Sequence, residues 1–218
     1  MINNERILPI FPLDVVLFPF MLLPLQIFED RYKQMLYDCQ EADSRFGVCL
    51  IQEGVEVGTP AIPNTIGTIT QVRQVTELED ARFALLTMGE RRFQVEEIIE
   101  WYPYEKARVT ILEESQGDPP FTTKEIEHIH ERLAPLLRSI FGLRGGWTRE
   151  IVSPPTPIDL SFHIASVIKG DLPTRQRILE ANTARERIDL LMPIVEQEVL
   201  DNQAKIQERT LLKGIRLN

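Results

Sequence analysis

Four prolines interrupt the most apolar stretch of the chain, ILPIFPLDVVLFPFMLLPLQIF at residues 7–28, and they constrain the fold more than any other feature. A membrane-spanning helix needs about 20 mostly apolar residues with an unbroken backbone hydrogen-bond ladder. Each proline removes one donor from such a ladder and pushes the residue before it toward extended geometry. We therefore predict that this stretch belongs to the core of a soluble protein and does not span a membrane.

Two short buried strands are expected in this stretch, at residues 7–11 and 15–18, followed by an apolar loop over residues 21–25. The prefix MINNER lacks the basic start of a signal sequence, and no small-x-small cleavage pattern follows the apolar run. We therefore expect a cytoplasmic protein.

The composition is that of a globular protein without disulfide or zinc cross-links. Among 218 residues, 43% are hydrophobic and 26% are charged. Cys39 and Cys49 are the only cysteines, which is too few for a disulfide framework or a four-cysteine zinc site. The net charge of −9 argues against nucleic acid as a partner, because that affinity depends on Lys and Arg neutralising phosphates.

The charge is distributed unevenly and indicates two domains. Residues 1–116 contain 10 basic and 19 acidic side chains, a balance of −9, whereas residues 117–218 contain 14 of each. Turn-forming residues, SQGDPP at 115–120, occupy the transition between the two compositions. We expect a β-rich lobe at residues 1–116 and a helical lobe at residues 117–218.

Period-two alternation dominates the first half and predicts strands. After a helix over residues 29–39, the expected strands lie at 46–52, 66–75, 81–88, 92–99 and 106–113. Gly89 and Glu90 are interpreted as the break between the third and fourth of these strands. Several short strands with tight turns and one helix are typical of a small, partly closed barrel.

A helical period replaces this alternation in the second half. Capping boxes at residues 122–125 and 183–186 mark the start of two helices, and Pro135 is expected to kink or break the first. Asp159 is expected to cap a helix between them. The predicted fold class is therefore α+β, with a β-rich lobe followed by a helical bundle that has a long last helix.

Motifs in the same order resemble the amino-terminal domain of Lon protease. The run LPIFPLDVVLFP at 8–19 and the run LPLQIFEDRY at 23–32 have the proline placement of that domain's opening. Further matches are VGT at 57–59, GTI at 67–69, GERRF at 89–93, YP at 102–103, QRILE at 176–180 and RIDLL at 187–191.

This resemblance covers nearly the whole chain and implies a PUA-like pseudo-barrel with one helix, followed by a helical lobe. In full-length Lon this unit recognises unfolded or tagged substrates and precedes an ATPase module and a serine–lysine peptidase. The chain stops at Asn218 and contains no G-x-x-x-x-G-K-[ST] phosphate loop. We therefore expect a free-standing substrate-binding protein and not an enzyme.

No constellation of residues predicts catalysis or a bound cofactor. Ser166 and Lys169 form an S-x-x-K motif, but the S-D-N and K-T-G elements that accompany it in hydrolases are absent. His128 and His130 are two positions apart on a predicted helix, so they point to different faces and predict no metal site. We expect no catalytic residue, no metal and no cofactor.

Large apolar side chains between two prolines are the main candidates for a binding surface. For Phe20, Met21, Leu22 and Leu23 the ordinary interpretation is buried core. The alternative is an exposed patch for unfolded segments, in which the flexible methionine would adapt to varied sequences.

Phe141 and Trp147 flank the glycine-rich run GLRGG and would add to this surface from the other lobe, or else pack at a hinge. We interpret the chain as a non-enzymatic polypeptide-binding or adaptor protein for unfolded or exposed apolar segments. A protease or chaperone and a second copy of the chain are further candidate partners, whereas nucleic acid and membranes are not expected. The alternative is an RNA-binding module, since the PUA-like lobe is shared with RNA-modifying proteins; the acidic first half argues against it.

Overall fold

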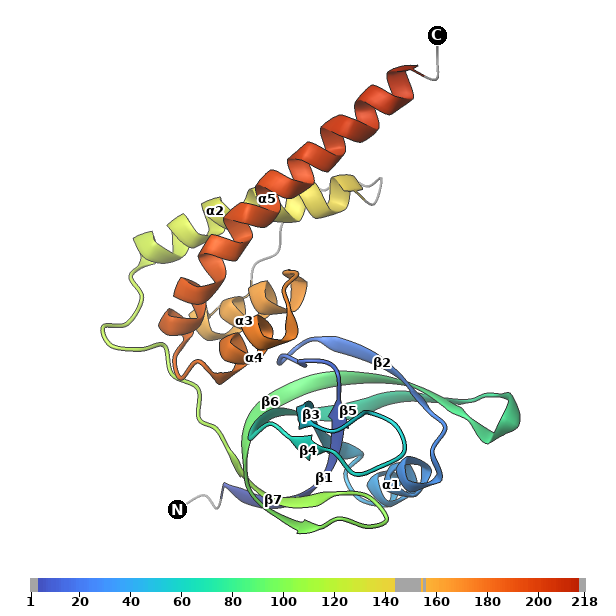
Figure 1. The fold of residues 1–218 in the computed structure, drawn as a ribbon. Coiled ribbons are helices and arrows are strands. Elements are labelled where there is room, and N and C mark those ends of the chain that lie inside the picture. The colour runs from blue at the N-terminus through green and yellow to red at the C-terminus, as the bar shows by residue number, and fades with distance from the viewer. Residues whose placement is uncertain (1–3, 144–153, 155, 216–218) are drawn as a thin grey trace. The chain divides into compact units, whose positions relative to one another are not determined.

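The computed structural model describes residues 4–143, 154 and 156–215 of the chain. In chain order its strands and helices are β1 (Glu5–Leu13), β2 (Leu22–Ile27), α1 (Asp30–Glu41), β3 (Arg45–Glu53), β4 (Ile62–Pro63), β5 (Ile66–Glu77), a 3-10 turn (Glu79–Ala81), β6 (Phe83–Glu100), β7 (Lys106–Ile111), α2 (Thr123–Leu143), α3 (Pro157–Val167), α4 (Leu172–Glu180) and α5 (Ala184–Ile215). Figure 1 labels these elements. These elements form two compact units, one rich in strands and one helical.

Five strands of the β-rich unit form a closed ring of hydrogen-bonded neighbours. β1 pairs antiparallel with β7, β7 with β6, β6 with β5, and β5 with β3, and β3 completes the ring by pairing in parallel with β1. Alternation along each strand directs one set of side chains inward, as in β7, where Ala107, Val109 and Ile111 are buried and Arg108 is exposed. The predicted α+β class with a β pseudo-barrel is confirmed.

Two clusters of buried side chains stabilise this unit. Leu8, Ile10 and Phe93 belong to the cluster inside the ring. In the second cluster, Tyr32 and Met35 of α1 pack against residues of β1, β2, β3 and β6. The apolar positions of α1 thus cover one end of the barrel, as the helical spacing of the sequence predicts.

The opening apolar stretch forms two strands, but the predicted bounds were wrong. β1 is longer than expected, and residues 15–18 have no regular structure. Most of the loop expected at residues 21–25 belongs to β2, which runs along β6. Pro24 caused the error, because a proline normally interrupts a sheet. A proline is tolerated in a strand with one free edge, and among the described strands β2 pairs with β6 alone.

The expected break at Gly89 was also wrong, because residues 83–100 form the single strand β6. Its first half pairs with β2, its second half pairs with β7, and β5 runs along both halves. A Cβ at Gly89 would lie 2.3 Å from the carbonyl oxygen of Phe18. The glycine is therefore needed where the chain crosses closely over β6 before entering β2, and it does not end a strand.

Helix α4 belongs to the β-rich unit, which comprises the described residues up to Glu113 together with Asp171–Glu180. Arg175 donates to the carbonyl oxygen of Val16 over 3.3 Å, and Gln176 donates to the carbonyl oxygen of Ile66 over 3.1 Å. From β6, the buried Arg92 donates to the carbonyl oxygen of Leu179. That residues 1–116 and 117–218 fold as separate domains therefore stays a prediction. The contacts of α4 place this helix in the first unit.

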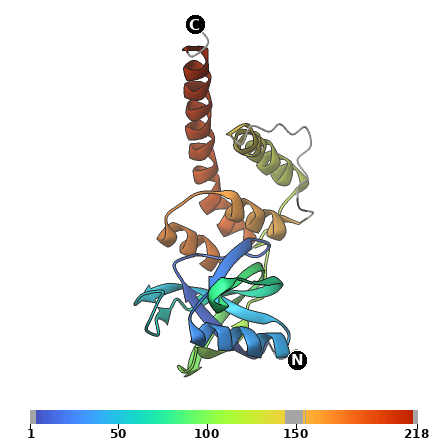
Figure 2. The same cartoon turned by 90° about the vertical axis from the view of Figure 1, so that its right-hand side faces the viewer.

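The helical unit contains Glu114–Gly170 and the chain from Ala181 onward. Helices α2 and α5 lie side by side, and Figure 2 shows α5 as one long helix. Pro135 lies inside α2, which continues through it to Leu143. Asn202 is buried and donates to Ser139 over 3.0 Å, so a polar pair replaces an apolar contact on the inner face. None of the helices in the described part of the chain is long and apolar enough to cross a membrane.

The capping boxes at both predicted helix starts are confirmed. Glu125 accepts from the N–H of Thr122 over 2.8 Å, and the N–H of Glu186 donates to Thr183 over 3.1 Å. The cap predicted for α3 was wrong, since Thr156 holds that position and accepts from the N–H of Asp159. Asp159, the predicted cap, is therefore three residues after the true cap and occupies position N3 of the same capping motif.

Candidate functional site

Three large apolar side chains are exposed on and beside β2, and we call Phe20, Leu22 and Phe28 the β2 row. Their exposed fractions are 42%, 55% and 48%. Alternation explains the arrangement, because Leu23 and Ile27 point into the core while their neighbours point to solvent. Exposed large apolar side chains that follow one another along one strand make this strand a candidate interaction site.

Phe20 is presented by an unusual backbone conformation. Its φ is +67°, in the left-handed region that side chains other than glycine rarely adopt. Two hydrogen bonds hold it there, since the N–H of Phe20 donates to Gly89 over 2.8 Å and the N–H of Gly89 donates to Met21 over 2.9 Å. The structure therefore stabilises a strained turn in which the side chain of Phe20 is 42% exposed.

The edge of β2 opposite β6 is available for backbone pairing. Gly89 donates to Met21, and the register continues through Leu22↔Met88 and Leu23↔Thr87. In an antiparallel pair the bonded positions alternate, so Leu22, Pro24 and Gln26 face away from β6. Their unpaired backbone groups form a free edge of the kind that binds extended polypeptides by strand addition.

A cavity of about 320 Å³ lies beside this edge. Its lining comes from four separate segments of the β-rich unit: Phe11 and Leu13 of β1, residues 24–29 of and after β2, Tyr32 of α1, and Glu56 with Val57 of the loop before β4. The lining is mainly apolar, and its volume is at the low end of the range for ligand sites. The cavity is therefore suited to one side chain of a partner and not to a large ligand.

An ion pair stabilises one wall of the cavity. Arg31 Nε lies 3.2 Å from Glu29 Oε2, and the same carboxylate accepts from the N–H of Gly58 over 3.1 Å. The Arg31 guanidinium also lies over the ring of Tyr32, 4.4 Å from its centre. Burial, followed by the nearby carboxylate of Glu105, raises the pKa of the Tyr32 hydroxyl, so this phenol remains neutral.

The residues predicted as binding residues have different environments. Phe20 and Leu22 are exposed, Met21 is half-buried, and Leu23 is buried at 8% exposure. The side chain of Phe141 and the whole of Trp147 lie outside the described residues. The two exposed residues stay candidates for binding, and Leu23 has the core environment of the ordinary interpretation.

Sequence reasoning did not include Phe28, Tyr32, Glu56 and Val57 in the site. For Phe28 a signal was present, because Leu22-Leu-Pro-Leu-Gln-Ile27 alternates with period two and the same alternation places residue 28 on the exposed side. No local signal identifies Glu56 or Val57, which reach the cavity only through the tertiary fold.

The described residues show no arrangement typical of nucleophilic or metal-assisted catalysis. Burial raises the pKa of the Cys39 thiol to about 12 and that of Cys49 further, so neither forms a reactive thiolate near neutral pH. Ser166 donates to the carbonyl oxygen of His163 within its own helix over 2.8 Å. Within the part of the chain that the structure describes, no three His, Cys, Asp or Glu side chains are grouped to hold a metal.

A second hollow, of about 340 Å³, lies between α2 and α5 in the helical unit. Its two arginines already have partners, since Arg185 pairs with Glu125 over 2.9 Å and Arg132 pairs with Glu196. The positive charges of this hollow are therefore neutralised within the protein, and it offers an anionic ligand less than its two arginines suggest.

The profile of the family described as the ATP-dependent protease La (LON) substrate-binding domain matches residues 7–197. The chain belongs to this family. The resemblance carried by the proline-rich opening and the later motifs is thus confirmed.

The chain is similar to the first part of several proteases. The Lon protease of Xanthomonas oryzae pv. oryzae is 31% identical over 214 residues, and that of Syntrophus aciditrophicus is 28% identical over 215 residues. These alignments cover 95% and 94% of this chain but 25% and 27% of the two proteases. The chain thus spans about a quarter of the length of these curated relatives.

Solved structures show the same fold. A Lon N-terminal domain protein from Xanthomonas campestris superimposes with a TM-score of 0.65 at 24% identity, covering 86% of this chain and 98% of that chain. The N-terminal domain of the Mycobacterium avium complex Lon protease gives a TM-score of 0.61 at 20% identity, covering 88% of this chain and 98% of that one.

Proposed function

We propose that this chain binds exposed apolar segments of non-native polypeptides at the β2 row, and acts as a recognition or adaptor protein without an enzymatic activity of its own. A protease or chaperone that receives the bound polypeptide, a second copy of the chain, and a cytoplasmic location are parts of this proposal. The observation that carries it is the exposure of Phe20, Leu22 and Phe28 along one free strand edge, beside an apolar cavity.

The chemistry of this surface fits an unfolded chain. The open backbone of β2 can pair with any extended segment, because main-chain hydrogen bonds do not depend on sequence. The β2 row adds apolar area, which contributes roughly 25 cal/mol for each Å² removed from water. Met21, next in sequence to two residues of the row, is half-buried against the core cluster, and a flexible thioether adapts to varied partners.

Polypeptide is favoured over RNA by the charge of this unit. Residues 1–116 carry a balance of −9, and a phosphate backbone would be repelled by such a surface. The family description, a substrate-binding domain of a protease, also points to a polypeptide ligand.

The test is a fluorescence anisotropy titration with a labelled protein that reduction and carboxymethylation keep unfolded. Phe20→Gly removes the ring and relieves the left-handed strain, so this variant is expected to fold normally. Leu22→Asn removes a second apolar side chain. Each should weaken binding about tenfold, as expected for a central interface residue.

Leu200→Asn is the matched control, because Leu200 is an exposed leucine on α5, and it should bind within about twofold of the parent. Equal affinity of all variants would disprove binding at the β2 row. Single-stranded RNA that binds as tightly as the unfolded protein at the same salt concentration would favour the RNA-binding alternative.

A further inference from the structure

We propose that the cavity beside β2 selects polypeptide segments in which an apolar residue is followed or preceded by Lys or Arg, with the apolar side chain inside the cavity and the cation held by Glu56. This inference rests on the proposed polypeptide-binding function and specifies its substrate class. It is carried by the position of one carboxylate at the rim of an apolar cavity.

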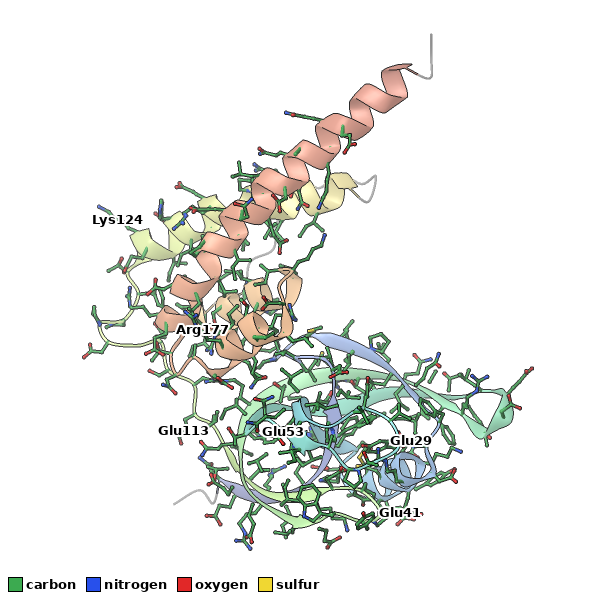
Figure 3. The ribbon with its side chains drawn as sticks, in the orientation of Figure 1. Glu29, Glu41, Glu53, Glu113, Lys124 and Arg177 are labelled. Carbon is green, nitrogen blue, oxygen red and sulfur yellow. The ribbon has the colours of Figure 1, made fainter. Side chains whose placement is uncertain are left out.

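The cavity provides an apolar surface with two acidic residues in its lining. Phe11, Leu13 and Tyr32 supply apolar groups, and Glu29 and Glu56 supply carboxylates. Figure 3 labels Glu29 beside the start of α1 in the β-rich unit. An apolar side chain in such a cavity leaves its neighbours along the chain next to the acidic residues.

Glu29 is already neutralised by the protein itself. It forms the ion pair with Arg31, and Arg31 Nη1 also lies 3.9 Å from the buried carboxylate of Glu105. Arg31, the only cation at this wall among the described residues, therefore lies close to two carboxylates. No positive charge is left there for a third.

Glu56 is the carboxylate without compensation. Within the described part of the chain it forms no ion pair and no side-chain hydrogen bond, and the residue is exposed. Partial removal from water, followed by repulsion from Asp14 and Glu29, raises the pKa of Glu56. A cationic side chain beside it would reduce this repulsion, whereas an anionic one would increase it.

The competing occupants fit less well. A metal ion lacks ligands, because no group of three suitable side chains is found among the described residues. Phosphate and other anions meet the field of Asp14, Glu29 and Glu56. A polypeptide with adjacent apolar and basic residues satisfies both the apolar lining and the free carboxylate.

The experiment uses the full chain and three labelled 15-residue peptides with a central phenylalanine. The residue next to this phenylalanine is Lys in one peptide, Gln in the second and Glu in the third, and the rest of the sequence is the same. The Lys peptide should bind about fivefold tighter than the Gln peptide at low salt, the upper range for a partly exposed ion pair. The Glu peptide should bind more weakly than both. The preference should decrease as added salt screens the charges.

Two variants separate the cavity's charge from the surrounding field. In Glu56→Gln the preference for Lys over Gln should disappear, while the affinity for the Gln peptide should stay within about twofold. Glu53→Gln is the control, because Glu53 is an exposed glutamate at the end of β3 outside the cavity lining, and it should keep the preference.

Equal affinities for the Lys and Gln peptides, or a preference that survives Glu56→Gln, would overturn this inference and leave the proposed function intact. Failure of the parent to bind any of the peptides and the carboxymethylated protein would overturn the proposed function, and this inference with it. Displacement of the Lys peptide by a second copy of the chain would instead assign the cavity to self-association.

Discussion

Glu105 is a carboxyl group that the fold buries almost without compensation. Its side chain is inaccessible, neither oxygen has a hydrogen-bond partner in the described structure, and Arg31 lies 3.9 Å away. Burial raises the pKa of Glu105, and the nearby backbone N–H of Glu105 itself, the charge of Arg31 and the backbone N–H of Ala61 only partly oppose this effect. Such a group destabilises the fold less when it is protonated than when it is charged.

This predicts a pH-dependent effect of Glu105→Gln. The pKa of the folded state lies above that of the unfolded chain, so the native state binds more protons in the interval between them. The contribution of Glu105 to stability is therefore fully present below about pH 4 and is lost as pH rises through the folded pKa. Gln stays neutral at every pH. The melting temperature of the variant minus that of the parent should therefore increase as pH rises from 4 to 8.

Glu97→Gln is the control for this series, because Glu97 is exposed and pairs with the exposed Arg108. Its melting temperature should follow that of the parent at each pH. A difference between Glu105→Gln and the parent that is constant with pH, or that favours the parent at high pH, would contradict the account.

Arg187 is a buried cation that the helical unit satisfies completely. Its side chain pairs with Glu114 over 3.1 Å, donates to Ser161 and to the carbonyl oxygen of Ala181 over 2.9 Å each, and stacks on the ring of Phe162. Three different acceptors around one planar guanidinium require arginine, because the ammonium group of lysine does not have this geometry.

Arg187→Ala should lower the free energy of unfolding by about 3 kcal/mol, because it leaves buried acceptors without a donor. Arg185→Ala, two residues away on the same helix, is the matched control. Its ion pair with Glu125 is partly exposed, so the loss should be below about 1 kcal/mol. Urea unfolding measures both, and equal losses would refute the distinction.

At the scale of elements, the crossing of residues 18–21 over β6 determines how β2 is presented. Gly89 permits the close approach of Phe18 and bonds to Phe20 and Met21 on either side of the turn. A side chain at residue 89 must displace backbone atoms, which are less able to move than the end of a flexible side chain.

We expect Gly89→Ala to lower stability by roughly 1 to 3 kcal/mol, as for other overpacked positions. Gln94→Ala on the same strand is the control, since Gln94 is exposed, and its effect should stay within about 0.5 kcal/mol. Thermal unfolding followed by circular dichroism makes the comparison. An unchanged melting temperature in Gly89→Ala would show that the crossing is loosely packed.

The elements differ in how well the sequence predicts them. Strand β7 and helix α1 follow from regular periodicity, because each buries one consistent face. β2 could not be predicted in the same way, since Pro24 is compatible with a strand only at a free edge, and a free edge is a property of the sheet. The cavity was beyond prediction because its lining joins four segments that only the tertiary fold brings together.

At the scale of the whole molecule, helix α4 lies in the sequence between two segments of the helical unit but packs in the β-rich unit. Pro173 is typical of the first turn of a helix and predicts a short helix through residues 175–181, close to the observed α4. The residues that decide where this helix packs are buried polar groups. Arg175 and Gln176 bond to backbone carbonyls of Val16 and Ile66 in the β-rich unit. A division at residue 116 would therefore separate α4 from the surface that it covers.

We predict that a fragment of residues 1–116 is less stable than the same fragment joined through a flexible Gly/Ser linker to residues 169–181. Without α4, the guanidinium of Arg92 loses its hydrogen bond to the carbonyl oxygen of Leu179, and the loss of a hydrogen bond to a buried charged group is destabilising. Melting temperatures of the two fragments decide the matter. Identical cooperative transitions would show that the first 116 residues are an independent folding unit.

Binding at the β2 edge is the central claim, and hydrogen exchange on the full chain tests it most directly. The backbone N–H groups of Leu22 and Gln26 face the free edge and should exchange rapidly in the unbound protein. With saturating carboxymethylated polypeptide, we predict slower exchange in residues 19–29 and in residues 54–59 beside the cavity. Protection confined to residues 117–170 and 184–215, or none in residues 19–29 at saturation, would contradict the account.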